Sequence, residues 1–252
     1  MDKEEQEKLI AYLKNHENII SLIEYSDRWD LEIVLIAKNL LEFDKIVLNI
    51  CESFPDIILE KDKLEIIRRY NSNHLPALIK EKGHDMIPIT HEQEVPVKLD
   101  ETDINILKIL TQDARTSTYE IGKQIGISPD TVSYRIKQLQ KEKVIHDFTI
   151  QVNLSLLNYI WYTFSMELKM FDHKNEKKFE EFLSQNQNVL RSAKTLGGWD
   201  LLLYMVVENP LEFHGIIKRL KNVFSNVIRN YQTWVAYKEH MFNPMPKTLY
   251  KL

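Results

Sequence analysis

Glycine is scarce in this sequence: 6 of the 252 residues are glycine, against a usual share of about 7%. These six residues cannot be arranged into the dinucleotide-binding fingerprint G-x-G-x-x-G or the phosphate-binding loop G-x-x-x-x-G-K-[ST]. The sequence therefore excludes both of these nucleotide-binding loops.

Cysteine and long apolar runs are also nearly absent. The single cysteine, Cys51, can form neither an internal disulfide nor a thiolate zinc site. The longest apolar run, residues 201–207, is too short to cross a bilayer, and the acidic start MDKEEQEKLI has no apolar signal segment. We therefore expect a cytoplasmic protein with no membrane contact.

Charge and histidine patterns point away from bulk nucleic-acid binding and from catalysis. The net charge is −4, so any nucleic-acid surface must be local. The eight histidines, at 16, 74, 84, 91, 146, 173, 214 and 240, form no i, i+4 pair. No Ser/His/Asp set or paired-carboxylate motif stands out either. The sequence predicts no catalytic residue, no metal, no cofactor and no enzyme activity.

An internal repeat organises most of the chain. RWDL at 28–31 recurs as GWDL at 198–201, and LEF at 41–43 recurs as LEF at 211–213, both at an offset of 170. The second copy predicts the order β-α-β-β-α-β, the ferredoxin-like arrangement. Its expected elements are a strand at 161–170, a helix at 176–184, strands at 189–196 and 201–207, a helix from Pro210 and a strand at 227–237.

The first copy begins at its first helix. It predicts a helix at 4–13, strands at 19–25 and 31–37, a helix at 40–52 and a strand at 57–67. The first strand has no counterpart, although it lies inside a ferredoxin-like sheet, where its loss leaves backbone groups unpaired. Two explanations stay open: the chain is a shortened form of a longer protein, or another segment occupies the position.

Between the copies, residues 99–153 carry the pattern of a winged helix-turn-helix. Asp100 can cap a first helix, and Ser117-x-x-Glu120 is a capping box for a second. Gly126 ends the second helix, and Ser128-Pro129 begins a third. Residues 144–145 and 148–152 then read as a short ribbon.

The third helix has the composition of a DNA-reading helix. Val132, Ile136 and Leu139 fall on one face, which we expect to be buried. The opposite face and its shoulders carry Asp130, Thr131, Ser133, Tyr134, Lys137, Gln138 and Lys141. The hydroxyl and amide side chains suit base edges and phosphates, and the lysines suit phosphates. Arg135, nearer the core, either contacts a phosphate or pairs with Asp103.

Four segments resemble the Lrp/AsnC (feast/famine) family of transcriptional regulators. They are LDETDINIL at 99–107, DARTS at 113–117, ISPDTV at 127–132 and YRI at 134–136. The repeat that follows is similar to the family's effector-binding and dimerisation module, with GWDL at its Gly-x-Asp hairpin. The arrangement resembles archaeal members built from two tandem units, here without the first helix-turn-helix.

The resemblance implies an α+β fold with a central winged helix-turn-helix between two ferredoxin-like effector modules. The expected divisions are an incomplete module at 1–70, a linker at 71–98 with a short helix at 77–81, the winged helix-turn-helix at 99–153, a complete module at 154–240 and a tail at 241–252. Two departures concern turns: residues 142–148, EKVIHDF, lack both glycines of the family's wing entry, and Asp27-Arg28 replaces the glycine pair in the first repeat. A left-handed Lys143 would cost about 1 kcal/mol.

What the family does becomes the expected function: sequence-specific regulation of transcription in response to an amino acid or related metabolite. The expected partners are double-stranded DNA and a second copy of the chain, paired through the sheets. Further DNA-contacting residues are Arg115, Thr116, Ser117 and Ser128. The effector is expected near Thr195, Gly197, Gly198 and Asp200, although the glycine pair also fits a plain tight turn.

Two other functions stay open. One is a ligand-binding or assembly module that pairs with relatives without strong DNA binding. The other is an enzyme similar to the sirohaem decarboxylases, which share the two-domain plan but need clustered His and Arg side chains at a porphyrin cleft.

Overall fold

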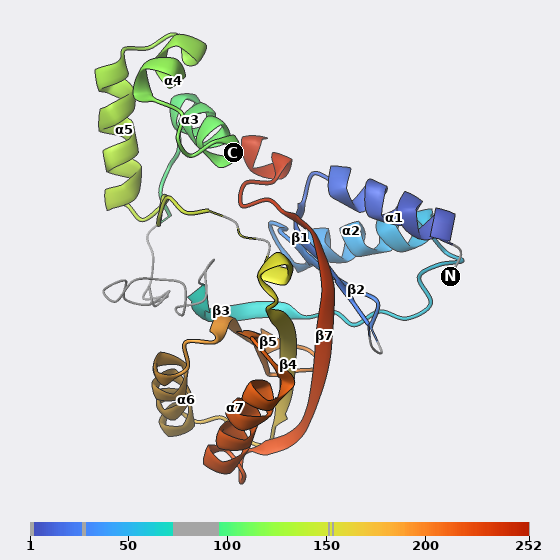
Figure 1. Cartoon of the computed structure of the whole chain (residues 1–252). Coiled ribbons are helices and arrows are strands. Elements are labelled where there is room, and N and C mark those ends of the chain that lie inside the picture. Colours follow the sequence, from blue (N-terminus) through green and yellow to red (C-terminus); the bar gives the residue numbers. More distant parts are fainter. Residues whose placement is uncertain (1–2, 27–28, 73–95, 151, 153, 252) are drawn as a thin grey trace.

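A computed structural model describes residues 3–26, 29–72, 96–150, 152 and 154–251 (Figure 1). The first elements are α1 (Lys3–Asn15), β1 (Ile19–Tyr25), β2 (Leu31–Leu35), α2 (Leu40–Ser53) and β3 (Glu65–Ser72). The central helices are α3 (Glu101–Gln112), α4 (Thr118–Ile125) and α5 (Pro129–Lys141). The last part holds η1 (Leu154–Leu157), β4 (Ile160–Leu168), α6 (His173–Gln185), β5 (Val189–Leu196), β6 (Leu201–Val207), α7 (Pro210–Val223), β7 (Ile228–Phe242) and η2 (Lys247–Lys251).

All strands of the described residues join one seven-stranded sheet in the order β2-β1-β7-β4-β6-β5-β3, and every neighbouring pair is antiparallel. The sequence predicts two ferredoxin-like modules, one on each side of the helix-turn-helix, and in the structure the strands of the two copies pair with each other. The first copy is split: its β1-β2 hairpin extends the sheet beyond β7, and its last strand, β3, pairs with β5 at the other end.

The sheet is curled, as shown by contacts across its inner face between strands that are far apart in its order. Glu32 of β2 accepts a hydrogen bond of 2.9 Å from Tyr204 of β6. Ile23, Tyr25, Leu202, Tyr204 and Trp234 form the apolar cluster of this inner face. Helices α1 and α2 pack outside one end of the sheet, and α6 and α7 pack outside the other, each pair over its own apolar core (Figure 1).

The 170-residue offset of the sequence repeat extends to the hydrogen bonds. The Asn18 side chain donates to Ile36 O at 3.0 Å, and the Asn188 side chain donates to Val206 O at the same distance. Helices α1 and α6 begin 170 residues apart, at Lys3 and His173, and end 170 residues apart. The two copies are therefore equivalent in local structure.

Strand pairing between the copies follows the same offset. Ser21 pairs with Phe242 and Tyr25 with Ala236. At the opposite junction Arg191 pairs with Ser72 and Thr195 with Ile66, the same pairs displaced by 170 residues in each strand. Both junctions contain two register shifts, at equivalent places. The copies are thus related by an approximate two-fold symmetry within one chain.

Two predicted elements are wrong in position or kind. The strand predicted at 57–67 begins only at Glu65, because no strand among the described residues lies beside residues 58–64 to pair with them. The predicted ribbon after α5 is not a ribbon: residues 144–145 and 148–150 carry no strand, as described below. The helix predicted at 77–81 lies outside the described residues.

The three central helices stand apart from the sheet (Figure 1). The carboxyl-terminal segment reaches them, since the Lys108 ammonium of α3 lies 4.5 Å from the ring centre of Tyr250. The same segment is held to the first repeat, because Thr248 N–H donates to Glu17 O at 2.9 Å. The tail thus connects the helical unit to the body.

Candidate nucleic-acid interface

Each of the three central helices begins at a side-chain cap that the sequence predicts. The Asp100 carboxylate accepts from Asp103 N–H at 2.9 Å, and Ser128 Oγ accepts from Thr131 N–H at 3.1 Å. Ser117 and Glu120 form the reciprocal capping box of α4. Such caps satisfy the free N–H groups of a first turn. They set the boundaries of the helices and therefore where α5 begins.

Packing then fixes which face of α5 points outward. Gly126 ends α4 with φ of +77°, the left-handed conformation expected there. Val132 is fully buried and Ile136 is half-buried, and both pack against Ile106 and Ile121 of the neighbouring helices. The opposite face is left for solvent or a partner.

The exposed face of α5 contains most of the predicted DNA-contacting residues. Asp130, Thr131, Tyr134, Lys137, Gln138 and Lys141 are exposed, and Ser133 and Arg135 are half-buried. Tyr134 is 65% exposed, which is high for an aromatic side chain.

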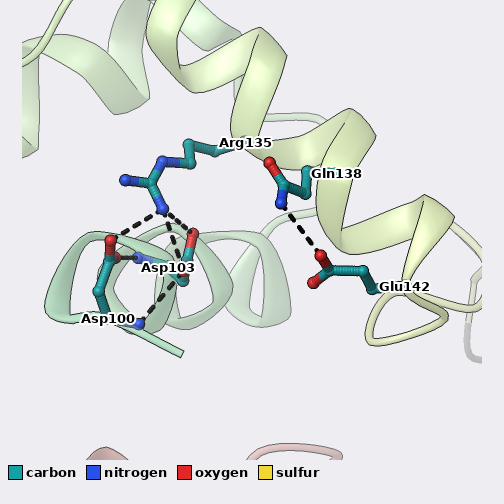
Figure 2. A network of polar contacts seen from close by, with 5 residues as sticks. All are labelled: Asp100, Asp103, Arg135, Gln138 and Glu142. Atoms are coloured by element: carbon teal, nitrogen blue, oxygen red, sulfur yellow. Dashed lines mark hydrogen bonds and ion pairs between the residues drawn. The ribbon is translucent and has the colours of Figure 1, made fainter. Parts of the chain in front are cut away.

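Some of these side chains have partners within the protein. Thr131 Oγ1 lies 2.8 Å from Ser128 Oγ. Gln138 donates to Glu142 at 3.0 Å (Figure 2). Tyr134, Lys137 and Lys141 make no hydrogen bond or ion pair with any other described residue. These three are the most available for an external partner.

Arg135 pairs with two aspartates of α3, the second of its two predicted alternatives (Figure 2). Its Nη1 lies 2.8 Å from Asp100 Oδ2 and 3.3 Å from Asp103 Oδ1. Asp103 is only 6% exposed. The Asp103 carboxylate raises the pKa of Arg135, and the Asp103 backbone N–H and Arg135 lower the pKa of Asp100. Arg135 therefore joins α5 to α3.

The start of α4 contributes the remaining predicted contacts. Arg115 and Ser117 are exposed, and Thr116 is half-buried, with Oγ1 donating to Asp113 O at 2.9 Å. Tyr119, which is 68% exposed, and Lys123 were missed by the sequence analysis. Their i, i+4 spacing, on the side of α4 away from Ile121, was a signal that could have identified them.

The segment after α5 explains why the predicted ribbon is wrong. Val144 N–H and Ile145 N–H both donate to Leu139 O, at 2.9 and 3.1 Å, so these groups finish the helix instead of pairing with a strand. Ile145 also packs into the helical core. Lys143 has φ of +59°, the left-handed conformation considered for it. The described residues thus contain a helix-turn-helix without a stranded wing.

The predicted effector residues lie together at the β5–β6 hairpin. Thr195 Oγ1 donates to Trp199 O at 2.6 Å, and Asp200 Oδ2 accepts from Leu168 N–H at 2.6 Å. A Cβ on Gly197, whose φ is +143°, would lie 2.5 Å from Lys63 O. The structure therefore brings these residues together but also gives them roles in the turn and in packing against the first repeat.

Comparison with known proteins identifies the central unit. The model of the AsnC-type helix-turn-helix domain matches residues 99–140. An uncharacterized HTH-type transcriptional regulator of Pyrococcus furiosus is 33% identical over 129 residues, which cover 50% of this chain and 85% of the relative. A second, from Pyrococcus horikoshii, is 32% identical over 126 residues, covering 49% and 83%. The chain belongs to the Lrp/AsnC family of transcriptional regulators.

Solved structures of similar regulators share the fold. A Neisseria meningitidis transcriptional regulator, solved as an L-Met complex, superposes with a TM-score of 0.53 at 20% identity, covering 62% of this chain and all of that one. An AsnC family regulator from Agrobacterium tumefaciens gives a TM-score of 0.50 at 22% identity, covering 58% and 95%. This Lrp/AsnC chain is thus an α+β protein with a curled antiparallel sheet.

The described residues contain neither a membrane-spanning helix nor a metal-binding cluster. No helix within them is long and apolar enough to cross a membrane. Among the same residues, no group of three or more His, Cys, Asp or Glu is arranged to hold a metal ion. Both relatives described above carry the name of HTH-type transcriptional regulators.

Proposed function

We propose that this Lrp/AsnC regulator reads double-stranded DNA in a sequence-specific manner with α5. The availability of Tyr134, Lys137 and Lys141 on one exposed face carries the proposal. Tyr134 is placed to contact base edges, while the two lysines, on the same side, contact phosphates. Arg135 is bound to Asp100 and Asp103 and acts by holding α5 in place.

The proposed domain division follows the predicted one. Residues 1–70 and 154–240 form two related effector-type modules, the first without its initial strand, and residues 99–153 form the DNA-binding domain. Residues 71–98 link the first module to it, and 241–252 are the tail, except that β3 and β7 each run two residues past these predicted boundaries, to Ser72 and Phe242. The matching strand registers of the two junctions support treating the modules as equivalent.

The pairing of the two modules within one chain changes which surface two copies of the chain must use to associate. The sheets that were expected to pair between copies already pair within one chain. One chain carries one described helix-turn-helix, so a two-half-site operator needs two copies that meet through another surface. We propose a homodimer or larger assembly of this kind on DNA.

An amino acid or related metabolite is the proposed effector, near Thr195, Gly197, Gly198 and Asp200. Support comes from the Neisseria meningitidis regulator, which was solved as an L-Met complex. Titrating each of the common amino acids by calorimetry, with Gly198→Val as the blocked variant, tests this. Equal binding by the variant, or no heat from any amino acid, contradicts the placement.

A random-oligonucleotide binding selection at fixed near-physiological salt tests the main proposal. We expect an enriched motif with two half-sites whose spacing reports the geometry of the assembly. The matched control is the double variant Lys137→Ala and Lys141→Ala, which should lose enrichment while keeping its fold by circular dichroism. Equal enrichment by the control would contradict the assignment to α5. Enrichment by neither protein would favour the assembly module over DNA binding.

A further inference from the structure

We propose that the two edges of the curled sheet, on β2 and β3, form an acceptor for one extended polypeptide segment of a partner. Within the described part of the chain, β2 pairs only with β1 and β3 only with β5. Edge strands offer unpaired N–H and C=O groups that another strand can bind. This inference does not depend on DNA binding.

The direction of the strands determines what fits between these edges. Each neighbour in the order β2-β1-β7-β4-β6-β5-β3 is antiparallel to the last, so β2 and β3, at the two ends of seven strands, run the same way. They cannot pair antiparallel with each other. One further strand, opposite in direction, can pair antiparallel with both and continue the alternation.

The second repeat contains the strand that fits. Strand β4 lies between β6 and β7 and pairs antiparallel with both. At the 170-residue offset, β2 is the equivalent of β6. Residues 58–66 are the equivalent of the part of β7 that pairs with β4. Residues 58–64 form no regular strand, whereas their equivalents at 228–234 do. The missing partner accounts for this difference.

The apolar core of the first repeat is open at the same place. Leu201, Leu203 and Met205 of β6 are 1%, 0% and 0% exposed. Their equivalents in β2, at 31, 33 and 35, are all only half-buried. Phe164 and Met166 of β4 pair with Leu203 and Leu201 and belong to the same core. An occupant of the β2–β3 position must therefore supply apolar side chains at alternate residues.

The described part of a second copy of this chain offers no such segment. Its described strands are paired on both sides, except at β2 and β3, which bound the acceptor themselves. The structure therefore favours a segment of different origin. Its chemistry is that of β4, IWYTFSMEL, in which apolar residues alternate with residues that face the inner side of the sheet.

Hydrogen exchange with a peptide tests the proposal directly. The probe is a lysine-flanked IWYTFSMEL peptide, and the control peptide carries proline in place of its phenylalanine, since proline removes a ladder donor. We expect amides at 31–35 and 58–66 to exchange at least ~10-fold more slowly with the probe and unchanged with the control. Protection by both peptides, or protection only outside residues 31–35 and 58–66, would contradict strand addition at this position.

A fused version keeps the test decisive if the free peptide binds weakly. Residues 160–171 join β4 to the start of α6, so a copy of them placed before Asp2 puts the same strand beside α1. The fusion should raise the unfolding temperature and protect 31–35, and its proline-containing counterpart should do neither. Failure of both peptide and fusion overturns the proposal. So does a dimer of the unmodified chain in which 31–35 are already protected, because a second copy is then the occupant.

Discussion

Tyr204 of β6 donates a hydrogen bond of 2.9 Å to Glu32 of β2, 172 residues away in the sequence. Tyr25 donates to the other carboxylate oxygen at 3.1 Å. The contact joins the two repeats across the inner face of the sheet. It places an ionisable group where an apolar one, Leu202, stands in the second repeat.

Glu32 gives the protein a pH-dependent stability. Desolvation raises the pKa of Glu32, although the bonds from Tyr204 and Tyr25 and the charge of Arg191 offset part of the rise. The folded state therefore holds this proton more tightly than the unfolded chain does. Stability should fall as the pH rises from the ordinary range of a carboxyl group through the raised pKa.

Glu32→Gln should flatten that part of the pH profile and make the protein relatively more stable at neutral pH. Chemical denaturation at a series of pH values measures this. Glu181→Gln, at an exposed position of α6, is the matched control and should leave the profile as it is. A wild-type profile that rises with pH over this range and is unaffected by Glu32→Gln would contradict the prediction.

Lys137→Ala should weaken binding to all DNA sequences and lower the slope of log affinity against log salt by about 1, because one phosphate contact is lost. Binding titrations at several salt concentrations measure both effects. Lys178→Ala, an exposed lysine of α6, is the control and should change neither. An unchanged slope would remove Lys137 from the interface.

Tyr134→Ala should alter base preference more than total affinity, since a base-edge contact contributes roughly 1–3 kcal/mol of discrimination. The comparison is between the enriched motifs of the variant and the wild type in the same selection. Tyr119→Phe, which changes a second exposed aromatic residue, on α4, is compared with Tyr134→Ala in the same selection. Should Tyr134→Ala and Lys137→Ala behave alike, the proposed orientation of α5 on DNA is wrong.

Arg135→Gln should destabilise the helix-turn-helix by about 1–2 kcal/mol, because Asp103 is left buried without its cation. The salt slope of DNA binding should stay near the wild-type value. Denaturant titration and salt-dependent binding of one preparation separate the two effects. A lowered slope with unchanged stability would show instead that Arg135 contacts a phosphate.

Gly197→Ala should destabilise the protein by about 1–3 kcal/mol, because φ of +143° is strained for any side chain and the new Cβ would meet Lys63 O. Gly198→Ala is the matched control, since its Cβ meets nothing within 4 Å. Thermal and chemical unfolding compare the pair. Similar losses from both would mean that the approach of residue 63 does not constrain this hairpin.

The sequence by itself determined the local elements and the internal repeat. The caps at Asp100, Ser117 and Ser128 and the left-handed Gly126 lie where the sequence places them, since each depends on side chains within three or four residues. The repeat is visible because equivalent turns and caps need the same residues, such as Asn39 and Asn209.

Only the tertiary structure decided how the two repeats combine. Nothing local in β3 marks β5 as its partner, because strand pairing depends on the edge that a distant segment presents. The choice of Arg135 between a phosphate and Asp103 was likewise set by the crossing of α5 and α3. The open position beside β2 shows both sides of this division: the sequence repeat makes it the equivalent of the β4 position, but the curl of the sheet determines that it lies between β2 and β3.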